Sequence, residues 1–264
     1  MKIDLTGKTA VVTGSSGGIG FAIAKGLAGT GARVIVNGRS KESVSGAIAK
    51  IKDAVKGARL DGVVTDVSTA TGCDAIVEAV PDTDILVNNA GGATFKSFFE
   101  ASDADWEQQF QFNVMSGVRL SRAYMQGMLK RNWGRIVFIS SESALHIPKD
   151  MIHYGFSKAA QLAVSRGLAE LTAGTSVTVN SVLPGPTRTE RMEGFMKAMG
   201  EREGITADEA GARFVKSQRG TSILQRMTST DEVANMVVYA CSKEASATNG
   251  AALRAEGGIV RTIA

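Results

Sequence analysis

Short apolar runs rich in β-branched residues alternate with helical repeats along almost the whole of this sequence. The runs cover residues 9–13, 33–37, 61–65, 84–88, 135–139, 176–183 and 251–254. Between them, apolar residues recur at helical spacing over residues 19–27, 41–55, 71–80, 103–131, 152–171 and 230–239. We expect the 103–131 stretch to form two helices or one bent helix. Because parallel strands need crossover connections, the alternation predicts an α/β fold with a doubly wound parallel sheet and helices on both faces.

No second domain is indicated by the sequence. The 264 residues contain no Pro-, Gly- or Ser-rich linker, no internal repeat and no break in composition. Hydrophobic residues make up 44% and charged residues 21%, which is typical of a globular protein with a sizeable core. We therefore predict a single domain over residues 1–264, in which residues 190–226 are an insertion with helical patches. The apolar side chains of these patches are Met192, Phe195, Met196, Met199 and Phe214.

Charge and cysteine content narrow the range of partners. The 30 basic and 26 acidic residues are interspersed, which does not favour nucleic acid, whereas the net charge of +4 suits an anionic cofactor. Two distant cysteines, Cys73 and Cys241, predict neither a disulfide framework nor a zinc site. No apolar run approaches the length of a membrane span, and no signal peptide is visible. We expect a cytoplasmic protein without a membrane partner.

A glycine-rich loop joins the first expected strand to the first expected helix. It reads Thr13-Gly14-Ser15-Ser16-Gly17-Gly18-Ile19-Gly20. This spacing differs from the G-x-G-x-x-G dinucleotide fingerprint, but it meets the same demands: a sharp turn, close approach to a pyrophosphate and a helix N-terminus that faces an anion. We assign the turn to Gly14, the close approach to Gly18 and helix packing to Gly20. Ser15 and Ser16 would offer hydroxyl and amide groups to phosphate, so the loop predicts a Rossmann-type dinucleotide site.

The end of the second strand bears on the choice between the two nicotinamide dinucleotides. A carboxylate at this place would bond the adenosine ribose hydroxyls and disfavour a 2′-phosphate. The sequence has Asn37-Gly38-Arg39-Ser40 instead, without a carboxylate. Arg39 could hold a 2′-phosphate by charge-assisted hydrogen bonds, or it could be a solvated loop arginine. NADP(H) is therefore favoured as the cofactor, and NAD(H) remains possible.

Further motifs follow the glycine loop in a characteristic order. They are Asn88-Asn89-Ala90-Gly91, Ser141, Tyr154-Gly155-Phe156-Ser157-Lys158 and Pro184-Gly185. With the loop at 13–20 and the C-terminal Ala252–Gly258 segment, they make the chain resemble the short-chain dehydrogenase/reductases over essentially its whole length. Each motif is weak alone, but five in this order exclude coincidence. The resemblance implies an NAD(P)-dependent oxidoreductase that acts on CH–OH groups.

The resemblance implies a catalytic set of Asn113, Ser141, Tyr154 and Lys158. Tyr154 and Lys158 are one helical turn apart, on one face. A free tyrosine titrates roughly three units above neutral pH, and a nearby ammonium favours the phenolate, so we expect Tyr154 to act as the general acid or base. Ser141 would polarise the substrate carbonyl, with Ser140 and Ser143 as its neighbouring rivals. Asn113 would organise a water-linked proton path to the lysine, although it could also be a plain polar residue of a long helix.

Most of the expected cofactor contacts also come from the resemblance. Lys158 would bond the nicotinamide ribose, Asp66 the adenine edge, and the carboxamide would bond backbone near Thr187. The full expected set is Gly14, Ser15, Ser16, Gly18, Ile19, Gly20, Arg39, Asp66, Val67, Asn88, Ala90, Gly91, Tyr154, Lys158, Pro184, Gly185, Thr187 and Thr189. Two positions depart from the family pattern. Gly17 replaces a larger residue, which leaves its phosphate contact in doubt, and the acidic residue before the final glycines is present only as Glu256.

The substrate itself stays open at this point. By resemblance, residues 190–226 are a substrate lid, whose apolar side chains suit a partly hydrophobic substrate or merely cover the site. A simple ketone, a sugar-like polyol and a 3-oxoacyl thioester all remain candidates, and the resemblance implies a homotetramer or homodimer. A non-catalytic dinucleotide sensor and a lyase or epimerase are the alternative functions. His146 and His153 could belong to the substrate rim, but they have no spacing typical of a zinc site.

Overall fold

One seven-stranded parallel sheet forms the centre of the molecule in a computed structural model that describes residues 2–263. Its strands lie in the order β3-β2-β1-β4-β5-β6-β9, and every neighbouring pair is parallel. They are β1 (Thr9–Val12), β2 (Arg33–Gly38), β3 (Arg59–Val64), β4 (Ile85–Asn88), β5 (Gly134–Ile139), β6 (Val177–Pro184) and β9 (Ala252–Ala255). The strand order reverses between β1 and β4, which places a ligand crevice at their carboxyl ends.

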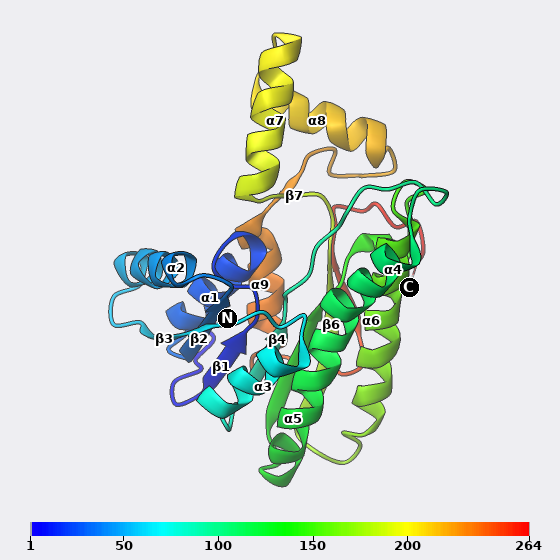
Figure 1. The fold of residues 1–264 in the computed structure, drawn as a ribbon. Coiled ribbons are helices and arrows are strands. Elements are labelled where there is room, and N and C mark those ends of the chain that lie inside the picture. Colours follow the sequence, from blue (N-terminus) through cyan, green and yellow to red (C-terminus); the bar gives the residue numbers. More distant parts are fainter. Residues whose placement is uncertain (1, 264) are drawn as a thin grey trace.

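Helices cover both faces of this sheet, as the alternating pattern predicts (Figure 1). One core lies between the sheet and α1 (Gly18–Gly29), α2 (Lys41–Ala54) and α9 (Thr230–Ala240). A second core lies beneath α3 (Ala70–Ala79), α5 (Ser116–Lys130) and α6 (Ile152–Glu170) on the other face. The side chains of Ser40 and Ser229 cap α2 and α9, each by accepting from a backbone amide of the first turn. The predicted doubly wound, Rossmann-type fold is confirmed.

Two local departures from the sequence pattern have clear causes. The edge strand β3 begins at Arg59, two residues before the expected 61–65 run, because all of its residues are exposed or half-buried and it therefore carries a weak apolar signal. The 103–131 stretch is one continuous helical run of α4 (Asp103–Gln109), a π-helical turn η1 (Phe110–Met115) and α5. A π turn widens the helix locally and often marks a functional site, and this one contains Asn113.

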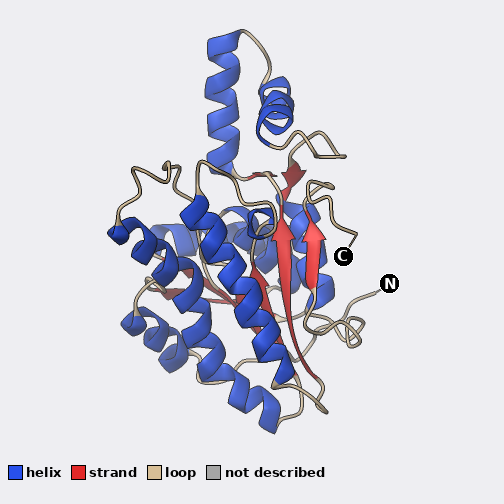
Figure 2. Ribbon diagram, turned by 90° about the vertical axis from the view of Figure 1, so that its right-hand side faces the viewer, coloured by secondary structure: helices blue, strands red, loops and turns tan. Residues whose placement is uncertain are grey.

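The expected insertion forms a small body of its own above the sheet, which we call the lid (residues 190–226). Helices α7 (Glu190–Glu203) and α8 (Ala207–Gln218) stand out beyond the carboxyl ends of the strands (Figures 1 and 2). They share a separate apolar core around Met196, Val215 and Met227. A short parallel pair that the sequence did not predict, β7 (Thr187–Arg188) with β8 (Thr228–Ser229), forms a separate two-stranded sheet and joins the two ends of the lid to each other.

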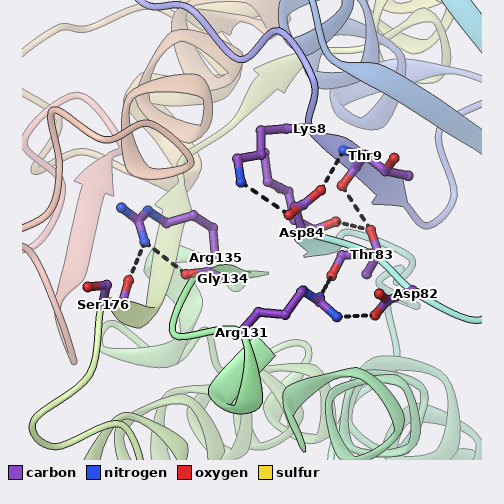
Figure 3. Close-up of polar contacts among 10 residues, drawn as sticks. Lys8, Thr9, Asp82, Thr83, Asp84, Arg131, Gly134, Arg135 and Ser176 are labelled. Carbon is purple, nitrogen blue, oxygen red and sulfur yellow. Dashed lines mark hydrogen bonds and ion pairs between the residues drawn. The ribbon is translucent and has the colours of Figure 1, made fainter. Parts of the chain in front are cut away.

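A polar cluster secures the opposite, amino-terminal edge of the sheet (Figure 3). Arg135 is almost fully buried and donates to the backbone carbonyls of Gly134, Ser176 and Ser242, at 2.8–3.0 Å. Its guanidinium lies over the Trp133 ring, as does the Lys8 ammonium, which also pairs with Asp84. These contacts join the starts of β1, β4 and β5, far in sequence from one another, and leave the carboxyl-terminal edge free for the site.

Candidate active site

A cavity of about 750 Å³ opens between the carboxyl ends of the strands and the lid. Ser141, Tyr154 and Lys158 line it together, so the structure assembles three of the four expected catalytic side chains in one place. Ser141 follows β5 immediately, while Tyr154 and Lys158 occupy successive turns of α6. The Lys158 ammonium nitrogen lies 5.7 Å from the centre of the Tyr154 ring. This arrangement puts a phenol, a hydroxyl and an amine around one space that can hold a small molecule.

The Lys158 amine is buried and held by two acceptors. It donates to the Ile139 carbonyl at 2.9 Å and to the Gln161 side-chain oxygen at 3.1 Å. Burial lowers the pKa of Lys158 to about 7, because no carboxylate offsets the loss of water around the charged form. A neutral amine keeps two hydrogens, which are enough for both acceptors. Lys158 can therefore gain or lose a proton near neutral pH.

Burial also governs Tyr154 and raises the pKa of its phenol above the ordinary value. The nearby Glu142 carboxylate adds to this upward shift of the pKa, whereas a hydrogen bond with Ser141 and the Arg219 charge oppose it. We expected the Lys158 ammonium to lower the pKa of Tyr154. The surrounding protein groups raise that pKa instead. The reason is that burial disfavours the charged form of both groups, so each tends towards its neutral form.

A buried ion pair lies directly beside the expected catalytic serine. The Ser141 hydroxyl donates to one carboxylate oxygen of Glu142, and the other oxygen accepts from the Arg219 guanidinium at 2.6 Å. Glu142 opens the short helix η2 (Glu142–Ala144), while Arg219 ends the lid helix α8. Both side chains are less than one-tenth exposed and both line the cavity. Sequence analysis missed this pair because the two residues are 77 positions apart.

Asn113 lies behind the cavity and connects the π turn to α6. Its side chain donates to Ser157 and accepts from the Gly92 amide, and its backbone carbonyl accepts from the Gln161 amide group at 2.5 Å. Since Gln161 also accepts from Lys158, its side chain links the Asn113 carbonyl to the lysine, and the expected water-linked path stays a prediction. Gln161, one turn after Lys158 on the same helix, is thus a site residue that the expected set omitted.

The glycine loop has the backbone shape that the sequence pattern requires. Gly14 and Gly18 have φ angles of +60° and +57°, in the left-handed region that favours glycine. A β-carbon on Gly14 would lie 3.1 Å from the Cα atom of Ala90. The buried Asn37 side chain fastens the turn, because it accepts from the Gly14 amide and donates to the Val63 and Thr65 carbonyls.

A smaller hollow of about 210 Å³ continues from the cavity across the strand crossover. It is lined by Ser16, Arg39, Asp66, Val67 and Ala90 among the expected cofactor residues. The two hollows share Gly14, Asn89 and Gly91, so together they form one trough over the carboxyl ends of β1 and β4. On the other side, the larger hollow is lined by the remaining expected contacts. These are Gly18, Ile19, Gly20, Pro184, Gly185, Thr187 and Thr189.

The chain is similar to known proteins over its whole length. The family model for the short chain dehydrogenases matches residues 8–199. The chain belongs to that family. It is 46% identical, over the full length of both chains, to the uncharacterized oxidoreductase YvaG of Bacillus subtilis (strain 168). A 3-oxoacyl-[acyl-carrier-protein] reductase of Aquifex aeolicus (strain VF5) is 34% identical and covers 98% of this chain and 100% of the relative.

Among solved structures, the dehydrogenase matches the L-sorbose reductase of Gluconobacter frateurii in complex with NADPH and L-sorbose. The two chains superpose with a TM-score of 0.93 at 32% identity, and each is covered completely. Family membership makes the protein an NAD(P)-dependent oxidoreductase, and it agrees with the Rossmann-type sheet. No helix within residues 2–263 combines the length and apolar character of a membrane span.

Two expected cofactor residues of the dehydrogenase lie elsewhere. The Ser15 hydroxyl donates to the Val12 carbonyl, and its amide donates to the Asn37 carbonyl, so neither group is left for a phosphate. Asn88 points away from the trough and donates to Ser121 beneath α5. Asn89, the first residue after β4, lines both hollows instead, and its side-chain amide donates to the Thr13 and Gly14 carbonyls.

Neither histidine of the dehydrogenase lines the cavity. His153 is buried beside Trp106, shares a 2.9 Å hydrogen bond with Thr94, and has its pKa lowered mainly by burial. This side chain therefore packs the start of α6 against α4 and the loop that connects β4 to α4. Within residues 2–263, no group of three or more histidine, cysteine or acidic side chains is arranged to hold a metal ion.

Proposed function

We propose that this dehydrogenase is an NADP(H)-dependent carbonyl reductase that also works in reverse as an alcohol dehydrogenase, with Tyr154 as the general acid or base. The observation that carries the proposal is the grouping of Tyr154, Ser141 and Lys158 around one cavity beside the glycine loop. A bound nicotinamide dinucleotide would supply or accept the hydride. A non-catalytic sensor would not need a phenol, hydroxyl and amine arranged in this way.

The trough has the features that such a cofactor requires. Gly14 and Gly18 have no side chain that would keep a dinucleotide away from the backbone, and the N-terminus of α1 points towards the trough. The amide of Gly18 already holds a carboxylate oxygen of Glu190 at 2.9 Å, so this position accepts an anion. Asn89 and Gly91 would lie beneath the middle of the dinucleotide, and Arg39 and Ser16 at its adenosine end.

The proposed preference for NADP(H) depends on Arg39. This exposed side chain lines the smaller hollow at the end of β2, where no carboxylate replaces it. A guanidinium can bind a 2′-phosphate through paired hydrogen bonds, which supports the preference. The NADPH-bound reductase with the same fold also supports it. An Arg39→Ser variant should lose about tenfold in affinity for NADPH and little for NADH.

The protein groups would act as follows during reduction. Ser141 would hold the carbonyl oxygen of the substrate and polarise it, while the Tyr154 hydroxyl gives that oxygen its proton. Lys158 lies beside the phenol and titrates near neutral pH, so it can restore the proton. Gln161 and Asn113 keep the lysine aimed at the tyrosine through two successive hydrogen bonds. During alcohol oxidation the same groups would act in the opposite order.

Replacement of Tyr154 by phenylalanine tests this assignment. The Tyr154→Phe variant should lose about a thousandfold in kcat, because the proton donor is gone. It should still bind NADPH with a nearly unchanged Kd, which a titration of NADPH fluorescence would measure. The assay should follow NADPH and NADH consumption with a panel of ketones, ketoses and 3-oxoacyl thioesters. Near-normal turnover of the variant would contradict the proposal.

A 3-oxoacyl thioester is the second candidate substrate. It is supported by the relation to the acyl-carrier-protein reductase and by the apolar lid side chains Met192, Phe195 and Phe214, which line the cavity. An acyl chain could pack against these side chains. The same substrate panel separates this candidate from a small polar ketone, since only one class should reach a high kcat/KM.

We also propose that the chain assembles as a homotetramer or homodimer through its long helices. The exposed Phe156 of α6 packs against the half-buried Trp106 of α4, with ring centres 5.6 Å apart. Such a pair suits burial against a second copy. Light scattering on the eluting protein would give its mass, and Phe156→Asp should shift that mass towards the monomer.

A further inference from the structure

The carboxylate of Glu142 is the most unusual group in the wall of the cavity. It is buried, it follows the catalytic serine directly, and the reaction as described above does not use it. A buried carboxylate is costly unless a cation and hydrogen-bond donors surround it. Here the Arg219 guanidinium supplies the cation and the Ser141 hydroxyl supplies one donor. A residue placed at this cost beside the reacting atoms needs an explanation.

The Glu142 carboxylate has room for further donors. Within residues 2–263, Ser141 and Arg219 are the donors that reach it, one at each oxygen. A carboxylate can accept about four hydrogen bonds, so roughly half of its capacity is left at a surface that lines the cavity. Because Arg219 balances its charge, the pair attracts a neutral hydrogen-bond donor more readily than a free cation.

The position of Glu142 relative to Ser141 determines where that donor lies on a substrate. The substrate carbonyl oxygen must come within hydrogen-bond distance of Ser141 and Tyr154. Glu142 lies beside Ser141 in the cavity wall, since the Ser141 hydroxyl donates to its carboxylate. On a substrate, a hydroxyl on the carbon next to the carbonyl lies beside the carbonyl oxygen in the same way. That hydroxyl can donate to Glu142, which keeps the carboxylate supplied with donors when the Ser141 hydrogen turns to the carbonyl oxygen.

We propose that Glu142, held in place by Arg219 of the lid, recognises a hydroxyl group on the carbon next to the reacting carbonyl, so that the preferred substrates are hydroxyketones, ketoses included. The inference rests on the proposed carbonyl reductase activity. A plain ketone brings acceptors only, and a 3-oxoacyl thioester has no hydroxyl on the carbons that flank its keto group. Either one would cover the carboxylate without giving it a hydrogen-bond donor. Its binding would therefore be less favourable than that of a hydroxyketone.

The lid gives this recognition a second role. Arg219 directly follows the last residue of α8, and its backbone amide donates to the Val215 carbonyl of that helix. The guanidinium therefore reaches Glu142 only when the lid lies over the cavity as it does here. A hydroxyketone that completes the Glu142 hydrogen bonds would stabilise this closed arrangement, whereas a plain ketone would not.

Two ketones of equal size provide the test. Hydroxyacetone and butanone differ by a hydroxyl in place of a methyl group, and both can be followed by NADPH consumption. We expect the wild-type enzyme to favour hydroxyacetone in kcat/KM by about a hundredfold. Glu142→Gln, which keeps the size but weakens the acceptor, should reduce that ratio by about tenfold. The Glu142→Leu/Arg219→Met double variant removes both charges and should bring the ratio close to one.

The double variant also guards against a folding failure, because replacing both partners leaves no unpaired buried charge. Circular dichroism and NADPH binding would verify that each variant is folded. A wild-type ratio near one, or a wild-type ratio retained in both variants, would overturn the role of Glu142. Loss of the role of Tyr154 would be recognised separately, since Tyr154→Phe would then still reduce both ketones.

Discussion

The Glu190 carboxylate of the lid accepts a 2.9 Å hydrogen bond from the backbone amide of Gly18 in the glycine loop. Glu190 is the first residue of α7, and Gly18 is the first residue of α1. The N-terminus of α1 carries the partial positive charge of a helix, which suits an acidic side chain as it would suit a phosphate. If the proposed dinucleotide places its pyrophosphate at this N-terminus, Glu190 and the cofactor would compete for the same backbone amide.

Removal of this carboxylate should strengthen cofactor binding. In Glu190→Ala the Gly18 amide is free, and a repulsive charge near the pyrophosphate is gone. We expect the Kd for NADPH to fall about two- to fivefold at low ionic strength and less at high salt. Fluorescence titration of NADPH at two salt concentrations would measure this. Glu201→Ala, near the other end of the same helix, is the matched control, and an equal gain in that variant would contradict the explanation.

Burial of Lys158 makes stability depend on pH. Its pKa in the folded protein is about 7, whereas the ordinary value is 10.5. Above about pH 7 the unfolded chain binds a proton that the folded protein lacks, so stability rises with pH; below pH 7 the full cost of burying the charge is present. Lys158→Met removes this cost. We expect the variant to exceed the wild type in stability at about pH 6, by an amount that shrinks towards about pH 9.

Urea unfolding of the cofactor-free proteins over this pH range is the measurement. The range stays below the ordinary tyrosine pKa of 10.0, at which the unfolded chain begins to lose the phenol proton and Tyr154 would begin to affect stability. An offset between Lys158→Met and wild type that does not change with pH would show that Lys158 keeps its proton in the folded protein.

Gln161 should matter for turnover more than for binding. It joins the Lys158 amine to the Asn113 carbonyl, and it lies behind the cavity. Gln161→Met breaks both hydrogen bonds, so we expect kcat to fall about tenfold with a smaller change in KM. In Gln161→Glu a carboxylate beside Lys158 favours the ammonium and should move the pH dependence of kcat upwards. A loss of kcat in both variants with an unchanged pH profile would indicate a purely structural role.

The amino-terminal edge of the sheet should affect stability without affecting catalysis. Arg135→Ala leaves the carbonyls of Gly134 and Ser176 without this donor (Figure 3), and the Ser242 carbonyl as well. We expect a loss of about 3 kcal/mol in the free energy of unfolding, measured in urea. Arg33→Ala is the control, because its ion pair with Asp61 is half exposed and should contribute less than about 1 kcal/mol. Equal losses in the two variants would contradict this ranking.

The sequence alone predicted the sheet, the glycine loop and the Tyr154–Lys158 pair, because each depends on residues that are near one another along the chain. Strands show a period of two or a continuous apolar run, and helices a period near 3.6. The left-handed turns at Gly14 and Gly18 follow from glycine itself. The one-turn spacing of Tyr154 and Lys158 places both side chains on a single face of α6.

Only the tertiary structure decided which groups surround those residues. Arg219 reaches Glu142 across 77 positions, and Glu190 reaches Gly18 across 172, distances over which no local pattern carries information. The same holds for Ser15, whose hydroxyl turned inwards to Val12, and for Asn89, which faces the trough instead of Asn88. Packing of the strands and the lid selects these contacts, because burial requires each polar group to find a partner wherever the fold provides one.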